Sequence, residues 1–280
     1  TAVQQAVDAA NPGDTVKVLG TCTGASGTQG SGAFGTNEAV YIDKDITIEG
    51  GYENSTGLNL ANPAAWTYPS SAASQRATLD ASSNGRVIEV AAGASVTLRN
   101  LNILNGSIAF NGTDGAGGCI YAPSSPELIL NNVDIQTCSV SVQGNGAALG
   151  GAILYVGAGD FDDRLVIENS TITGGQLSSS SNGSPNDGAR GGALFVTGAE
   201  DVRITDTTIS GTQVTVNDSS AASPMLGGGL YMNGVGTVTI QGSMVSNNTM
   251  TSSSPLAAQS LGGGIYVKDM EDVTIEDSTF

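Results

Sequence analysis

Short runs in which apolar and polar residues alternate recur along most of the chain, and one of them repeats as a distinct phrase. In this phrase a glycine pair leads into an alternating apolar run, and full copies stand at residues 117–121, 150–154, 191–195, 227–231 and 262–266. Successive copies start 33, 41, 36 and 35 residues apart. Weaker copies stand at residues 85–90 and 40–42. Self-similarity at such a period predicts a solenoid, here of about seven coils.

Two further alternating runs follow each copy of the phrase. The second run is seen at residues 165–167 and 202–204, and the third at 170–172 and 207–209. A polar tract of variable length, such as residues 178–187, then leads into the next copy. Three short strands and a projecting loop per turn predict an all-β fold, a single-stranded right-handed parallel β-helix. The alternative architecture is an antiparallel propeller, which has four strands per repeat. Only three alternating runs are recognisable in each repeat, which favours the β-helix.

Strand alternation assigns the positions of the phrase to two faces. The fourth and sixth positions are apolar in the full copies, as in Ile153 with Tyr155 and Leu194 with Val196. We expect these side chains to point inward and to stack from coil to coil into ladders that carry most of the stability. The glycine pair suits a tight corner, where positive φ or close backbone approach excludes a Cβ.

The fifth position of the phrase is expected to face outward, and aromatic residues recur there. They are Tyr121, Phe195, Tyr231 and Tyr266. An exposed aromatic row usually marks a contact, because aromatic rings stack well on sugar rings or on partner side chains. We predict that this row is a binding face. Two alternatives stay open: long loops fold back over the row, or the phase is inverted and the row lines the core.

The first residues predict a cap over the open end of the solenoid. A short amphipathic helix is expected over residues 1–10, with these apolar residues on one face: Val3, Ala6, Val7 and Ala10. A solenoid needs such a cover over its first hydrophobic coil, so residues 1–14 are assigned to the cap. No domain boundary is visible, and residues 1–280 are predicted to form one domain with an inserted loop at 53–77. Phe280 falls in the middle of a repeat, so we expect the chain to be incomplete at this end.

Composition and charge narrow the partners. The chain has 40 glycines, no histidine and only 12% charged residues, and its formal net charge is −17. Binding of nucleic acid or of an anionic membrane needs clustered Lys and Arg, so neither is expected. A run of roughly 18 apolar residues, which a membrane-spanning helix needs, is not present in the sequence.

Three cysteines are present, Cys22, Cys119 and Cys138. They fit neither a zinc site nor a disulfide-dense scaffold. Cys119 and Cys138 lie within one repeat and are able to pair in an oxidising compartment. Small buried thiols are the alternative, and the sequence does not decide between them.

The repeat resembles that of a known family. The sequences Gly-Gly-Ala-Ile at 150–153 and Gly-Gly-Ala-Leu at 191–194 are similar to the short repeat of bacterial polymorphic outer-membrane proteins, which are β-helical surface adhesins and autotransporter passengers. Residues 244–247 approximate the second motif of that family, Phe-x-x-Asn, and residues 3–15 resemble the leading cap of many secreted bacterial β-helix proteins. The resemblance implies a secreted or cell-surface protein that binds glycans or proteins of a host or neighbouring cell. It assigns no binding residue to this chain.

Candidate catalytic groups are few. Glycoside hydrolysis needs two carboxylates, and the densest group is Asp160, Asp162 and Asp163, with Arg164 and Arg190 as the nearby cations. The histidine of the polygalacturonase-like pattern is missing, so we predict no enzyme and no cofactor.

Acidic residues also recur at the turn after the first strand, at Glu200, Asp201, Asp269, Glu271 and Asp272. We interpret them as a solvated turn edge, with structural calcium as the alternative; no metal is predicted.

The sequence is compatible with three functions. The leading one is a non-catalytic extracellular adhesin or displayed structural rod. The others are a subunit of an extracellular filament or sheath that associates end to end, and a polysaccharide lyase or hydrolase of the β-helix type.

Overall fold

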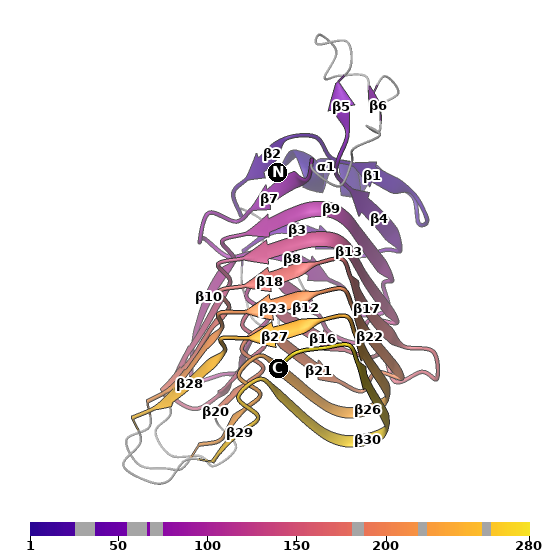
Figure 1. The fold of residues 1–280 in the computed structure, drawn as a ribbon. Coiled ribbons are helices and arrows are strands. Elements are labelled where there is room, and N and C mark those ends of the chain that lie inside the picture. Colours follow the sequence, from indigo (N-terminus) through magenta and orange to yellow (C-terminus); the bar gives the residue numbers. More distant parts are fainter. Residues whose placement is uncertain (26–36, 55–65, 68–74, 181–187, 218–222, 254–258) are drawn as a thin grey trace.

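The chain forms a parallel β-solenoid of about six turns, as seen in a computed structural model that describes residues 1–25, 37–54, 66–67, 75–180, 188–217, 223–253 and 259–280 (Figure 1). About 3% of the chain is helical. The predicted all-β fold class is confirmed. The seven copies of the repeated phrase form seven rungs joined by six coil-to-coil pairings, which is why there is one turn fewer than predicted.

Three rows of parallel strands make up the main body of the coil. The first row holds the repeated phrase: β3 (Glu38–Ile42), β8 (Arg86–Val90), β12 (Ile120–Ala122), β16 (Ile153–Val156), β21 (Leu194–Thr197) and the first parts of β26 (Leu230–Gln241) and β30 (Ile265–Glu276). The second row holds β1 (Thr15–Lys17), β4 (Ile46–Glu49), the first parts of β9 (Val96–Leu104) and β13 (Glu127–Gln136), β17 (Arg164–Glu168), β22 (Asp201–Thr205) and the later parts of β26 and β30. The third row holds β2 (Thr21–Thr23), β7 (Ala77–Asp80), the later parts of β9 and β13, β18 (Thr171–Thr173), β23 (Thr208–Ser210) and β27 (Met244–Ser246).

Apolar ladders fill the interior of these three rows. Ile120, Ile153, Leu194 and Leu230 are directly in register and fully buried, and the sixth-position residues Ala122, Tyr155, Val196 and Met232 are buried beside them. All eight belong to one continuous core. The predicted inward face is therefore confirmed.

The polar tract that was predicted to be a projecting loop contains two more strand rows. The fourth row holds β10 (Ser107–Asn111), β14 (Ser139–Gln143), β19 (Gln176–Ser180), β24 (Gln213–Val216) and β28 (Thr249–Ser252). The fifth row holds β11 (Gly115–Ala116), β15 (Ala147–Leu149), β20 (Gly188–Arg190), β25 (Met225–Leu226) and β29 (Ser260–Leu261). Together they form a lobe along one side of the coil, on the left in Figure 1, and the prediction of three strands per turn is corrected to five.

The lobe has a small apolar core of its own. Val140, Val142, Leu177, Val214 and Val216 are buried in it, because they occupy alternate positions of the fourth-row strands. Residues 181–187 and 218–222 lie outside the described residues.

The glycine pair stands where the fifth row turns into the first. Gly150 has φ +57°, a region that side chains disfavour, and a Cβ on Gly151 would meet the carbonyl oxygen of Gly192 in the next coil. Both predicted reasons for glycine, positive φ and close backbone approach, are thus confirmed, one for each residue of the pair.

The N-terminal helix α1 (Ala2–Ala9) buries Val3 and Val7 in the main core beside the first coil. Ala6, which was predicted to share that face, is exposed because the helix contacts the coil along a narrow stripe. The inserted loop expected at 53–77 contains a short antiparallel pair, β5 (Glu53–Asn54) with β6 (Trp66–Thr67), and most of the rest lies outside the described residues.

Candidate functional site

The predicted aromatic row lies beneath the fifth strand row. Tyr121, Phe195 and Tyr231 are each only 8% exposed, and Tyr266 is half-buried. They form a cluster separate from the main core, with Ala116, Leu149 and Leu226 of the fifth-row strands against them. Phe195 stacks on Tyr231 with ring centroids 4.9 Å apart, and Tyr231 stacks on Tyr266 at 5.4 Å.

The outward direction of this row is confirmed, but its exposure is not. The lobe folds back over the outer face of the first strand row and buries the rings, which was the first alternative left open by the sequence. Burial also raises the pKa of Tyr121 and Tyr231 above the ordinary value for tyrosine. A partner role for these residues stays a prediction, and the structure offers little of their surface for it.

The acidic group at residues 160–163 has separate structural roles for its members. Asp160 and Asp162 are exposed, whereas Asp163 is fully buried. Its Oδ2 accepts hydrogen bonds from the backbone N–H groups of Gly159 at 2.6 Å and Asp160 at 3.0 Å. Its backbone carbonyl accepts from the N–H groups of Glu200 and Asp201 in the next coil, at 2.9 and 3.0 Å. Asp163 therefore fixes the loop before β17 and ties it to its neighbour.

The two cations suggested for catalysis are placed on different sheets. Arg164 begins β17 in the second strand row, and Arg190 ends β20 in the lobe. The acidic turn edge borders a shallow hollow of about 290 Å³ lined by Asp160, Glu200, Asp269 and Glu271. Within the described part of the chain, no three acidic, cysteine or histidine side chains are grouped closely enough to hold a metal ion.

A larger polar trough lies on the outer face of the second strand row, which sequence reasoning missed. It has a volume of about 540 Å³, and its walls come from β4, β9, β13, β17 and β22. The strand register places Glu49, Arg99, Asn131 and Glu168 side by side in consecutive coils. A parallel line in the middle of the face carries Ile129, Val166 and Arg203.

Polar groups in the trough are paired by contacts within one strand and between neighbouring strands. Arg203 pairs with Asp201 at 2.8 Å, and Asn131 donates to Glu168 at 2.9 Å. Arg164 is paired with Glu127 in the preceding coil. Arg99 is exposed and makes no ion pair with any residue that the structure describes. The trough thus presents fixed donors and acceptors in one plane above an aliphatic floor.

A second hollow, of about 450 Å³, continues the trough at its edge. It shares Arg164 and Asp201 with the first, and Phe161 is part of its wall. Phe161 is 97% exposed. Its loop spans residues 157–163 between β16 and β17, longer than the corresponding connection at 198–200 between β21 and β22. The sequence signal that was available is this extra loop length together with a phenylalanine among polar residues.

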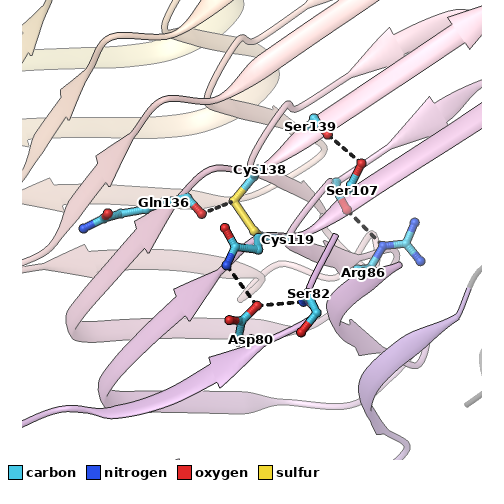
Figure 2. The surroundings of a disulfide bond; sticks show 10 residues. Asp80, Ser82, Arg86, Ser107, Cys119, Gln136, Cys138 and Ser139 are labelled. Atoms are coloured by element: carbon cyan, nitrogen blue, oxygen red, sulfur yellow. Dashed lines mark hydrogen bonds between the residues drawn. A yellow bond between two sulfur atoms is a disulfide. The ribbon is translucent and has the colours of Figure 1, made fainter. Parts of the chain in front are cut away.

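A disulfide closes the coil at the neck of the lobe. Cys119 and Cys138 are both fully buried and bonded, with their Cα atoms 5.4 Å apart (Figure 2). Cys119 directly precedes β12 and Cys138 directly precedes β14, so the bond joins the point where the chain enters the three-row body to the point where it leaves. Next to it, Ser139 donates a hydrogen bond to Ser107 of the preceding coil at 2.9 Å. The sequence left two alternatives for Cys119 and Cys138, a disulfide or two buried thiols, and the structure has the disulfide.

Comparisons of the chain with protein-family models, with curated proteins and with solved structures each find no match. Among the described residues, no helix is both long and apolar enough to cross a membrane. The resemblance to polymorphic outer-membrane proteins therefore remains a prediction from the repeat.

Proposed function

We propose that this protein is a non-catalytic, extracellular binding rod that attaches its bearer to another surface. The observation that carries the proposal is Phe161, an almost fully exposed phenylalanine on a loop fixed by buried Asp163, beside a polar trough. Burial of this ring against a partner would remove apolar surface from water, which is favourable, and the adjoining trough supplies polar groups for the same partner.

The buried disulfide supports the extracellular part of the proposal. Disulfides persist in oxidising compartments and are rare where thiols are kept reduced. The bond between Cys119 and Cys138 lies within a single coil and joins two fully buried residues. It suits a secreted protein or one displayed on a cell surface.

The arrangement of charges supports binding rather than catalysis. Asp201 is paired with Arg203, and Glu168 accepts a hydrogen bond from Asn131. Asp163 accepts two hydrogen bonds through its Oδ2 from backbone N–H groups of its own loop. These bonds fix the carboxylates as acceptors within a network. A glycosidase instead needs an acid and a base or nucleophile on either side of one bond.

Attachment of coated beads tests the proposed function. Beads carrying the folded protein are incubated with a panel of bacterial and animal cells, and beads carrying reduced, unfolded protein serve as the control. We expect saturable attachment of the folded protein to at least one cell type, competed by free protein. Attachment no better than the control across the panel would contradict the proposal. Release of new reducing ends or unsaturated sugars from polysaccharides would favour the alternative function, a lyase or hydrolase, instead.

A further inference from the structure

We propose that the trough and Phe161 together form one site for a linear, uncharged oligosaccharide, with a sugar ring stacked on Phe161 and the following sugars along the face of β22, β17, β13 and β9. This inference rests on the proposed binding function and names its ligand class and site. The two hollows adjoin, because Arg164 and Asp201 line both of them.

The polar groups of the trough have the chemistry that sugar hydroxyls need. A hydroxyl both donates and accepts, so neighbouring hydroxyls are matched by flat side chains that offer two donors or two acceptors side by side. Arg99 and Arg203 supply such donors, Glu168 supplies acceptors and Asn131 supplies both. The ion pair of Arg203 and the hydrogen bond between Asn131 and Glu168 set the positions of these three side chains in advance, which lowers the entropy lost on binding. Arg99 makes no ion pair with any residue that the structure describes, so its donors are open to a ligand.

The aliphatic floor and Phe161 suit the other face of a sugar ring. Ile129 and Val166 lie next to each other in the middle of the trough, between the polar lines. The C–H groups of a pyranose ring form an apolar face that packs on such surfaces. Phe161 lies in the hollow beside the trough, along the edge where β13, β17 and β22 begin, and a sugar ring stacked on it would cover exposed apolar surface.

The charge balance argues for an uncharged ligand. The trough is lined by three arginines, Arg99, Arg164 and Arg203, and by three carboxylates, Glu49, Glu168 and Asp201. The trough itself is therefore locally neutral, whereas the adjoining hollow at Phe161 adds three carboxylates, Glu127, Asp162 and Glu200. These carboxylates and the field of a chain whose formal net charge is −17 disfavour an acidic polymer, and the three guanidinium groups within the trough disfavour a cationic one there.

The length of the trough argues for an oligomer. From Glu49 to Arg203 it crosses five coils, and at a strand spacing of about 4.8 Å the four steps span roughly 19 Å. That length exceeds a single sugar ring. A ligand that follows the whole trough is therefore an oligomer of several sugars.

A glycan array with the purified protein tests the inference. The array carries neutral linear oligomers of glucose, N-acetylglucosamine, mannose and galactose in several linkages, and as acidic comparators oligogalacturonate and sialylated chains. We expect binding of at least one neutral series that strengthens with chain length, with the acidic chains bound more weakly. An array with no neutral glycan bound, or with only acidic glycans bound, would overturn the inference.

Matched variants locate the site. For the neutral glycan that binds best, titration calorimetry should show affinity weakened roughly five- to tenfold by Phe161→Ala, as for a hot-spot aromatic, and by about fivefold for Arg99→Gln or Arg203→Gln, which remove one charged donor. Phe280→Ala and Lys268→Gln are the controls, because both residues are exposed and lie outside the trough. Circular dichroism verifies that each variant is folded. Unchanged affinity in the three trough variants would place the site elsewhere.

The same variants separate this inference from the proposed function. Beads coated with the Phe161→Ala and Arg203→Gln double variant should attach to cells poorly. If they attach as well as wild-type beads, the rod is an adhesin but its trough is not the binding site. If wild-type beads do not attach, the proposed function itself fails.

Discussion

Arg86 is predicted to be the most damaging single position on the first strand row. It is fully buried, and its Nη1 pairs with Glu89 at 2.8 Å. Its Nε and Nη2 donate to the backbone carbonyls of Gly117 and Ala116, each at 2.9 Å, and its guanidinium lies 4.6 Å from the ring centre of Tyr121. One side chain thus ties β8 to the fifth-row strand β11 and to the start of the aromatic row.

The expected loss follows from what Arg86→Met leaves behind. The variant keeps most of the side-chain volume but takes the cation away from the buried Glu89 carboxylate and the donors away from two carbonyls. Removal of one partner of a buried ion pair costs about 3–5 kcal/mol, mostly through the charge that remains. The double variant Arg86→Met with Glu89→Gln should therefore lose less than Arg86→Met alone, since Glu89 then leaves no unpaired charge; buried Glu38, which also interacts with Arg86, keeps its carboxylate in both variants.

Urea unfolding followed by far-ultraviolet circular dichroism measures these differences. Arg203→Met is the matched control, because Arg203 is also paired with a carboxylate but is exposed, and its change should stay within about 0.5 kcal/mol. Two results would refute the reasoning that burial makes this pair costly to break. One is a loss below about 1 kcal/mol for Arg86→Met, and the other is an equal loss for Arg86→Met and Arg203→Met.

Three further variants test other parts of the structure. Replacing Cys119 and Cys138 together by alanine should lower the free energy of unfolding by about 3 kcal/mol, because the bond closes a loop with a sequence separation of 19. A melting temperature of the wild-type protein that does not change with reductant would contradict this prediction. Gly151→Ala should cost about 2 kcal/mol by overpacking against Gly192, whereas Gly263→Ala, at the same position of the last described coil, meets nothing within 4 Å and should be nearly neutral. Burial raises the pKa of Tyr155 above its ordinary value, so the tyrosine contributes stability that is present below pH 10 and is lost as the pH rises further. Tyr155→Phe should flatten that alkaline loss, seen as urea midpoints from neutral to alkaline pH; an unchanged slope would argue against burial as its cause.

The main coil was predictable because its alternation is strict. Ile153, Leu194 and Leu230 recur at one position of a repeated phrase, and a period of two fixes which face they occupy. The lobe was missed because its inward positions mix aliphatic residues with serine, as in Leu177 followed by Ser179. Its fifth-row strands are also only two or three residues long. In a serine-rich tract such a pattern reads as a loop.

The trough was missed for a different reason. Arg99, Asn131 and Glu168 each stand at an ordinary outward position of their own strand, and only the strand register brings them together. The acidic residues around Phe161 drew attention to catalysis, while the phenylalanine among them is the exposed group. The burial of the aromatic row depends on the lobe, so the missed strands of the lobe also left the low exposure of this row unpredicted.

The lobe also explains why binding is assigned to the opposite side of the coil. Its strands cover the outer face of the first row, whereas the second row, with β17 and β22 on the right in Figure 1, carries no strand layer among the residues that the structure describes. The polar side chains that face outward from the second row, such as Arg99 and Arg203, are exposed there. The aromatic row and the trough therefore differ in what lies over them.

Immunogold electron microscopy of intact cells that make the protein, with an antibody raised against this chain, tests the central claim most directly. An extracellular attachment rod predicts gold particles scattered over the outer surface of cells that have not been permeabilised. Gold confined to the cytoplasm, seen only after permeabilisation, would contradict the account. Gold along continuous fibres would replace attachment with end-to-end assembly.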